Sequence, residues 1–251
     1  MHPARLAIAV SMLTLAFSSA VFCETQEGYL KYARDYKKLK ARVTGRIELP
    51  KGYHEGLLIE GDNILIANGD GGKIWAVNRS SGRVVSEIEP IAGFTEALSG
   101  KSPGIYFTTD WDEEKLYEAK IENGRMLPLK EMSVSPAHPA GAAWTGEKLY
   151  VITWTRGMGT KFDLLELDGD MNLLRKVRIK DIQEPCQMAW DGKDLWITSW
   201  FYRLVYRIDI NTLKITGRFV SPISKTTGIA WDGQQMWLTG TYADLYRLEI
   251  S

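Results

Sequence analysis

The sequence predicts an all-β fold, a five-bladed β-propeller closed by its N-terminal strand. The first observation is a motif of one apolar strand, a tight Asp-Gly or Thr-Gly turn, and a second strand rich in β-branched and aromatic residues. It occurs at Gly141–Thr153, at Met188–Ser199 and at Gly228–Gly240. The other two observations are the spacing of the repeats and an unmatched strand at each end of the series.

The repeats have a nearly constant length. Their opening residues are 41 to 46 positions apart, at Gly56, Ala97, Gly141, Gln187 and Gly228. Each unit has room for about four strands, which the first unit places at Gly56–Glu60, Asn63–Asn68, Lys73–Asn78 and Arg83–Glu89. Units of about 40–45 residues with four strands are typical of propeller blades. The second unit is the weakest copy, because Leu98–Ser102 lacks the Trp-Asp-Gly turn.

The two ends of the series complement each other. The last unit stops one strand short after Asp244–Ile250, while Thr44–Leu49 resembles the last strand of a repeat with no repeat before it. A lone strand leaves backbone groups unpaired. We therefore expect Thr44–Leu49 to complete the fifth blade, so that residues 44–251 form one propeller domain.

Two segments precede this domain. Residues 1–23 have the charge pattern and apolar run of a secretory signal, which predicts a protein exported to the periplasm or the extracellular space. A retained anchor and lipidation at Cys23 are the alternatives. Residues 24–43 are predicted to form a short helix, since tyrosines recur at helical spacing between basic residues. This helix would lie against the propeller or, alternatively, on a membrane surface.

The composition limits the classes of partner. Thirty-one basic and 31 acidic side chains give a formal net charge of zero, so no field favours nucleic acid. Three histidines and two cysteines form no metal motif, and no cofactor is expected. Cys186 is interpreted as a small buried thiol, with a nucleophile as the alternative. We expect a monomer without stable membrane insertion after signal removal, which takes a small peptide or another small ligand.

The ligand site is expected where the inner strands of the blades begin, because the loops on one face of a propeller usually carry the ligand site. The ends of the second strands return to the same rim. The polar and aromatic residues at these positions are Glu55, Glu96, Asp110, Trp111, Trp154, Trp200 and Tyr242. Aromatic walls exclude water and raise the pKa of a carboxyl, which suits acid–base chemistry. Packing between blades is the alternative role of the three tryptophans.

The repeats resemble the plant and bacterial type of glutamine cyclotransferase, a secreted five-bladed propeller, over residues 44–251. Thr227–Asp232 with Thr239-Gly240 is similar to the family's Asn-Gly-Ile-Ala-Trp-Asp and Thr-Gly-Lys signature, and Phe94–Leu98 to Phe-x-Glu-Gly-Leu. Tyr53–Leu57 is similar to Phe-Thr-Gln-Gly-Leu, and Leu195–Trp200 to Ile-Trp-Ala-Asn-Val-Trp. The resemblance implies a metal-independent conversion of N-terminal glutamine to pyroglutamate with release of ammonia.

The resemblance also implies roles for single residues. Glu96 matches the glutamate that shuttles protons, and Trp200 matches a tryptophan of the substrate pocket. His54, Glu55, Asp110, Trp111, Trp154 and Tyr242 complete the expected substrate-binding set. Three motifs depart from the family pattern: Glu55 replaces glutamine, Thr241 replaces lysine, and Pro185–Met188 replaces Asn-Glu-Leu-Glu.

Two functions therefore remain open from the sequence. One is a divergent cyclotransferase with Glu96 as the acid–base group. The other is a non-catalytic exported propeller that binds a peptide, glycan or small ligand on its aromatic rim. A lactonase-type propeller is the third possibility, but it requires a calcium cage of carboxylates and Asn that the repeat openings do not supply.

Overall fold

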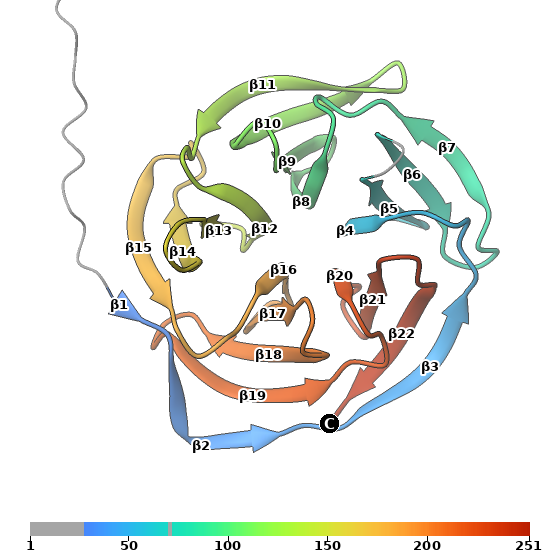
Figure 1. Ribbon diagram of the computed structural model, residues 1–251. Coiled ribbons are helices and arrows are strands. Elements are labelled where there is room, and N and C mark those ends of the chain that lie inside the picture. Colours follow the sequence, from blue (N-terminus) through green and yellow to red (C-terminus); the bar gives the residue numbers. More distant parts are fainter. Residues whose placement is uncertain (1–27, 70–71) are drawn as a thin grey trace, which may run out of the picture.

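The computed structural model describes residues 28–69 and 72–251, which form five β-sheets around a central axis (Figure 1). The expected signal segment and Cys23 lie outside these residues. Blade one is β4 (His54–Glu60), β5 (Asn63–Asn68), β6 (Lys73–Asn78) and β7 (Val84–Ile88). Blade two is β8 (Thr95–Ser102), β9 (Ile105–Asp110), β10 (Lys115–Glu122) and β11 (Arg125–Ser133). The strands predicted for the first unit are confirmed to within two residues.

The other three blades follow the same meander from the axis outward. Blade three is β12 (His138–Trp144), β13 (Leu149–Thr155), β14 (Lys161–Leu167) and β15 (Leu173–Ile179). Blade four is β16 (Pro185–Trp190), β17 (Leu195–Ser199), β18 (Leu204–Asp209) and β19 (Lys214–Val220). Blade five is β20 (Thr226–Trp231), β21 (Met236–Gly240), β22 (Leu245–Ile250) and β3 (Ala41–Ile47). The predicted five-bladed propeller is confirmed.

The ring is closed by its own N-terminal part, as the sequence predicted. Strand β3 pairs antiparallel with β22, with Leu245 opposite Ile47 and Ile250 opposite Ala41. The fifth blade therefore contains three strands from the end of the chain and one from its beginning. This pairing covers the outer edge of β22, whose backbone groups would otherwise lack partners.

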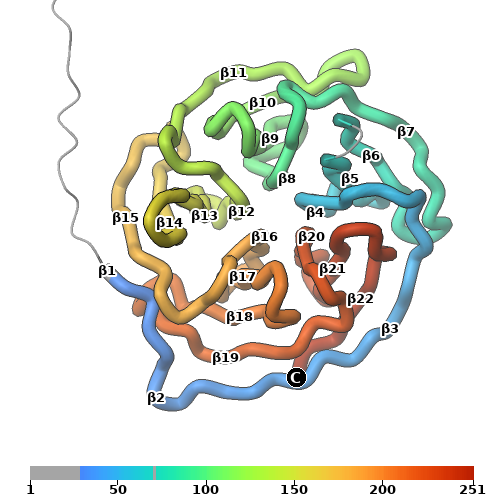
Figure 2. The backbone as a smooth tube through the Cα atoms, viewed as in Figure 1, coloured from blue at the N-terminus to red at the C-terminus, as the bar shows by residue number. Residues whose placement is uncertain are grey.

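The segment before β3 is not the expected helix. Strand β1 (Gly28–Tyr29) pairs in parallel with β15, and β2 (Lys31–Lys38) pairs in parallel with β19, so the segment runs along the outside of blades three and four (Figure 2). The described residues contain no helix, and hence none that could cross a membrane. The physical reason is that the outer edges of β15 and β19 offer backbone groups that need partners, while a short isolated helix is marginal in water.

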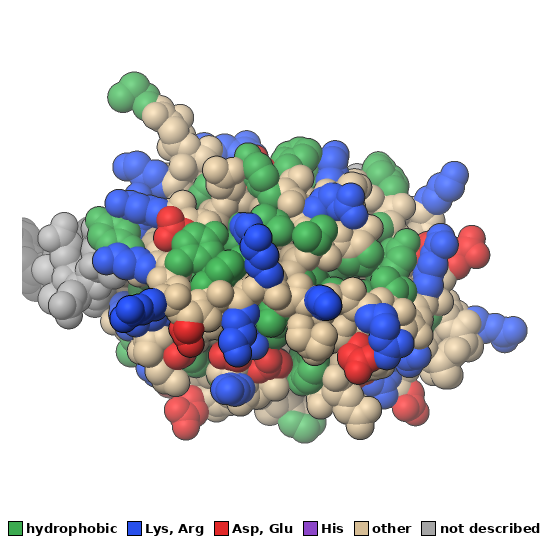
Figure 3. Space-filling view, turned by 90° about the horizontal axis from the view of Figure 1, so that it is seen from below, with side chains coloured by type: hydrophobic (Ala, Val, Ile, Leu, Met, Phe, Trp, Pro, Cys, Tyr) green, Lys and Arg blue, Asp and Glu red, His purple; other side chains and the backbone are tan. Residues whose placement is uncertain are grey.

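The exposed side chains of β2 carry a net positive charge, since four of them are basic and one, Asp35, is acidic. Lys31, Arg34, Lys37 and Lys38 are all exposed, and Lys and Arg side chains are prominent in the edge-on view from the side of β2 and β3 (Figure 3). Charged side chains on an edge strand oppose pairing with another chain.

The core consists of five clusters of buried side chains, one at each interface between neighbouring blades. In the cluster between blades four and five, Trp196 packs with residues of both blades. Its indole N–H donates to Asp191 Oδ2 at 2.7 Å, and Trp237 donates to Asp232 at the same distance. The same two aspartates accept backbone N–H groups of their own turns, so the Asp-Gly turn and the buried tryptophan form one repeated unit.

Candidate functional site

A cavity of about 340 Å³ opens at one end of the central axis. Each inner strand contributes one residue to it, namely the residue directly before the repeat opening. These five positions, which we call the floor, are Glu55, Glu96, Ala140, Cys186 and Thr227. The walls are Tyr53, Phe94, Trp111, Asp112, Trp154, Arg156 and Trp200.

A β-bulge places the floor residues. The pairing between the first and second strands shifts register at the same point in all five blades, for example between Thr95 and Ala97 and between Thr226 and Gly228. A bulge interrupts the alternation of side chains and changes the direction of one of them. The recurrence of the bulge explains why the floor positions are equivalent although their side chains differ.

Three titratable side chains meet on the floor. One ligand atom each of Glu55, Glu96 and Cys186 lies within 4.8 Å of the others, and Cys186 Sγ is 3.9 Å from Glu96 Oε1. All three residues are buried. The sequence did not predict this group, because its members come from blades one, two and four. Two carboxyls and a thiol at this spacing are close enough to bind one metal ion.

The floor favours the protonated forms of its acids. Burial and, to a smaller extent, the nearby carboxylates of Asp110 and Asp112 together raise the pKa of Glu96 to about 8, against a small opposing effect of the hydrogen bond with Cys186. Burial and the Glu96 carboxyl also raise the pKa of the Cys186 thiol well above its usual value. Glu96 is therefore mostly neutral at pH 7 and sits close to the pH at which it exchanges a proton, which is the property required of an acid–base group.

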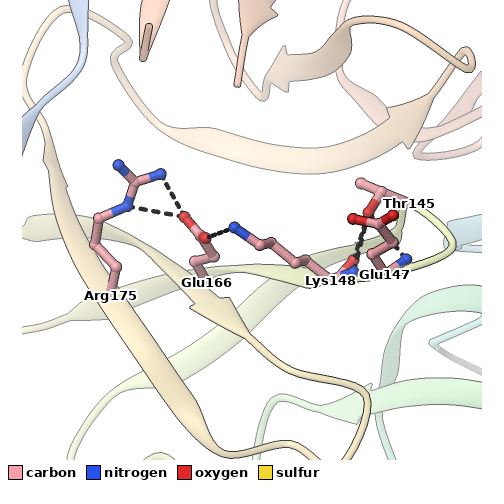
Figure 4. Close-up of polar contacts among 5 residues, drawn as sticks. All are labelled: Thr145, Glu147, Lys148, Glu166 and Arg175. Carbon is pink, nitrogen blue, oxygen red and sulfur yellow. Dashed lines mark hydrogen bonds and ion pairs between the residues drawn. The ribbon is translucent and has the colours of Figure 1, made fainter. Parts of the chain in front are cut away.

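A buried glutamate in blade three shows the opposite behaviour. Burial alone would raise the pKa of Glu166, but hydrogen bonds from Lys148 and Arg175 outweigh it and lower that pKa (Figure 4). Lys148 Nζ lies 2.5 Å from Glu166 Oε1, and Arg175 Nε lies 2.8 Å from Oε2. Glu166 is thus an ionised structural residue, whereas the described residues give Glu96 no basic partner.

The walls are a set of interlocking aromatic rings. Trp111 stacks on His138 with ring centroids 4.8 Å apart and meets Trp154 edge to face at 5.6 Å. The Trp154 indole N–H donates to the Pro185 carbonyl at 2.6 Å, which fixes that ring against blade four. The guanidinium of Arg156 lies over the Trp111 ring, 5.4 Å from its centroid.

The structure brings together most of the residues expected at the rim. Glu55, Glu96, Trp111, Trp154 and Trp200 all line the cavity. The three tryptophans also contact other rings, so packing and lining are combined in the same side chains.

Three of the expected residues lie beside the cavity and do not line it. The Asp110 carboxylate accepts the backbone N–H groups of Phe94 and Glu113, and so ties two loops together. The ring of His54 is buried between the carbonyls of Ala243 and Pro50, and burial lowers its pKa. Tyr242 is 66% exposed and meets Tyr53 edge to face.

Several lining residues were missed from the sequence. Arg156 and Asp112 lie in loops outside the repeated strands, so the repeat alignment carries no signal for them. Tyr53 and Phe94 stand two residues before Glu55 and Glu96. Because Glu55 and Glu96 stand at equivalent positions of neighbouring repeats, the aromatic residue two positions before each of them was an available signal.

The buried thiol allows a direct test of the floor geometry. In a Cys23→Ser variant, in which only Cys186 can react, iodoacetamide at pH 8 is expected to alkylate the folded protein at least about 100-fold more slowly than the unfolded chain. The reason is that the burial of Cys186 both blocks access and disfavours the thiolate. Mass spectrometry over time gives the two rates. Equal rates would contradict the placement of Cys186 on the floor.

Comparison with models of known protein families gives no match to this sequence, and comparison with curated proteins gives none. Solved structures do match. The glutaminyl cyclase of Myxococcus xanthus superposes with a TM-score of 0.70 at 14% identity, over 86% of this chain and 98% of that one. The PQQ-bound aldose sugar dehydrogenase of Streptomyces coelicolor gives a TM-score of 0.58 at 11% identity, over 85% and 99%. At such identities the likeness is one of fold. The resemblance to the cyclotransferase propellers is confirmed at that level.

Proposed function

We propose that this chain is an exported, monomeric cyclotransferase-like propeller that takes the N-terminal residue of a peptide into its cavity, with Glu96 as the acid–base group. The observation that carries the proposal is a buried carboxyl with a pKa near 8 on the floor of an aromatic cavity. The glutaminyl cyclase of Myxococcus xanthus supports it through the shared fold. Export is proposed from residues 1–23 of the sequence.

The reaction needs one proton to move a short distance. The α-amine nitrogen of an N-terminal glutamine attacks the carbon of its own side-chain amide, a five-membered lactam forms, and the carbon–nitrogen bond of the amide breaks. Ionised Glu96 accepts a proton from the amine and delivers it to the departing nitrogen, which leaves as ammonia. Trp111, Trp154 and Trp200 exclude water from the amide, and Glu55 contacts the peptide end. His54, Asp110 and Tyr242 support the loops at the mouth.

The test is whether the protein releases ammonia from Gln-Ala, measured with a coupled enzyme assay at pH values from 5.5 to 9.5. The reactive state needs an ionised Glu96 and a neutral amine. Because the pKa of Glu96 is about 8 and that of a peptide amine is also near 8, kcat/KM should rise through this range and level off above about pH 9. No ammonia at any pH from correctly folded protein would reject the cyclotransferase function.

A binding protein without turnover is the second candidate, and three substitutions favour it. Glu55, Cys186 and Thr241 stand where the related enzymes are expected to have glutamine, glutamate and lysine. A site that recognises an amide through polar contacts loses much of its selectivity when these contacts change. Under this alternative, peptides would bind in the cavity while the ammonia assay remained negative.

A further inference from the structure

The cavity is acidic in its composition. Glu55 and Glu96 on the floor and Asp112 on the wall are carboxylic acids, and Arg156 is the one basic residue among the lining side chains of the described chain. Once its acids are ionised, the cavity has a net negative charge. Such a charge favours a cationic ligand, and the low dielectric of a buried site strengthens the attraction.

The walls favour the same kind of ligand. Tyr53, Phe94, Trp111, Trp154 and Trp200 surround the floor, and the faces of such rings attract cations. Arg156 already shows this attraction, since its guanidinium rests on Trp111. Aromatic walls favour an organic cation over a metal ion as the ligand, because a metal ion is bound through ligand atoms and gains little from contact with rings.

We infer that the cavity binds the alkylammonium head group of a small organic cation, held between the two floor carboxyls and the aromatic walls. At about 340 Å³ the cavity is at the small end of ligand pockets, so a compact head group fits it better than a long chain. The inference goes beyond the proposed function, because it requires no turnover and extends to quaternary cations, which have no N–H to give up.

Glu96 links this binding to a proton. The buried acids of blade three form ion pairs with basic side chains, as Asp163 Oδ1 does with Arg178 Nε at 2.5 Å. Among the described residues, the titratable groups around Glu96 are the acids Asp110, Asp112 and Glu55 and the neutral side chains of Cys186 and Tyr53. The one basic lining residue, Arg156, lies on the wall over the Trp111 ring. In the empty cavity a proton therefore neutralises Glu96, and an entering cation takes the place of that proton.

The sign of the pH effect follows. A cation stabilises the ionised form of Glu96, so its affinity rises as pH increases through about 8. A quaternary ammonium does not titrate, so any dependence of its affinity on pH must come from the protein. At pH 7 binding should release up to one proton, and at pH 9.5 close to none.

The experiment compares choline with 3,3-dimethyl-1-butanol, its neutral isostere, by isothermal titration calorimetry at pH 6, 7 and 9.5. We expect choline to bind at least about tenfold more tightly than the alcohol at pH 9.5, with the difference shrinking at pH 6. Repeating the pH 7 titration in buffers of different ionisation enthalpy counts the released protons. Equal affinities for the two compounds, no binding of choline, or a choline affinity independent of pH would each overturn the inference.

Two variants should move the choline affinity in opposite directions. Glu55→Gln removes a floor charge and should weaken choline at least about fivefold, while the alcohol is unaffected. Arg156→Gln removes the resident cation from Trp111 and should tighten choline binding. Glu147→Gln, in an exposed turn of blade three, is the control and should change neither. A loss of choline affinity in both Glu55→Gln and Arg156→Gln would indicate general damage to the cavity and would overturn the assignment.

The inference and the proposed function fail separately. Choline binding by a protein that releases no ammonia would uphold the inference and reject the cyclotransferase function. Ammonia release by a protein that choline neither binds nor inhibits would do the reverse.

Discussion

Glu96→Gln is expected to lower the rate of ammonia release by about 10²–10⁴-fold, the usual contribution of a general acid–base group. The glutamine side chain has the same shape but cannot exchange a proton. Since Glu96 is mostly neutral at pH 7, the neutral replacement leaves the packing of the floor in place. The measurement is kcat/KM for Gln-Ala at pH 8.5, with circular dichroism to confirm the fold.

The control is Glu131→Gln in the same blade, whose side chain is 58% exposed and pairs with Lys115. It should retain full activity. Thermal stability separates a chemical effect from a structural one. Because the pKa of Glu96 rises from 4.5 in the unfolded chain to about 8 in the folded protein, the wild type loses stability as pH increases between these values, and the loss is complete at pH 9. Glu96→Gln should therefore be at least as stable as the wild type at pH 9. A variant of normal activity would contradict the acid–base role.

Gly228→Ala is expected to destabilise the protein by about 3 kcal/mol or more. A Cβ at this position would lie 2.5 Å from the Glu55 carbonyl oxygen and 2.6 Å from Thr239 Cγ2. Glycine is thus what allows β20 to approach β4 so closely at the axis. For a domain of this size the change corresponds to a fall in Tm of about 6–12 °C.

Gly93→Ala is the matched control, because a Cβ there meets no atom within 4 Å. Its Tm should stay within about 2 °C of the wild type. Differential scanning calorimetry of both variants decides the matter. A Gly228→Ala variant as stable as Gly93→Ala would mean that the inner strands are less tightly packed than described.

Much of the fold was predictable because it is repeated. The five openings are visible as a nearly constant spacing, and the missing last strand identified Thr44–Leu49 as the closing one. The helix expected at residues 24–43 was wrong over its described part for a tertiary reason. Tyr29, Tyr32 and Tyr36 have helical spacing, but the unpaired edges of β15 and β19 lie far away in the sequence and decide the backbone conformation.

The candidate site was predictable only where it follows the repeat. Glu55 and Glu96 stand at equivalent positions, and a register argument locates both. The group that they form with Cys186 depends on how three blades meet at the axis, which no local pattern encodes. Asp110 and His54 are each next in the chain to a lining residue, but their side chains turn away from the cavity, as adjacent residues of a strand do.

The bulge shared by all five inner strands makes the five floor positions independent of one another in the choice of side chain. Because the backbone sets the direction of each of its side chains, one position can change its chemistry while the ring stays intact. Ala140 and Thr227 are the two positions that carry no ionisable group at present. An acidic residue at either one would alter the charge balance facing a ligand without a new loop or strand, so a single codon would be enough to change what this propeller recognises.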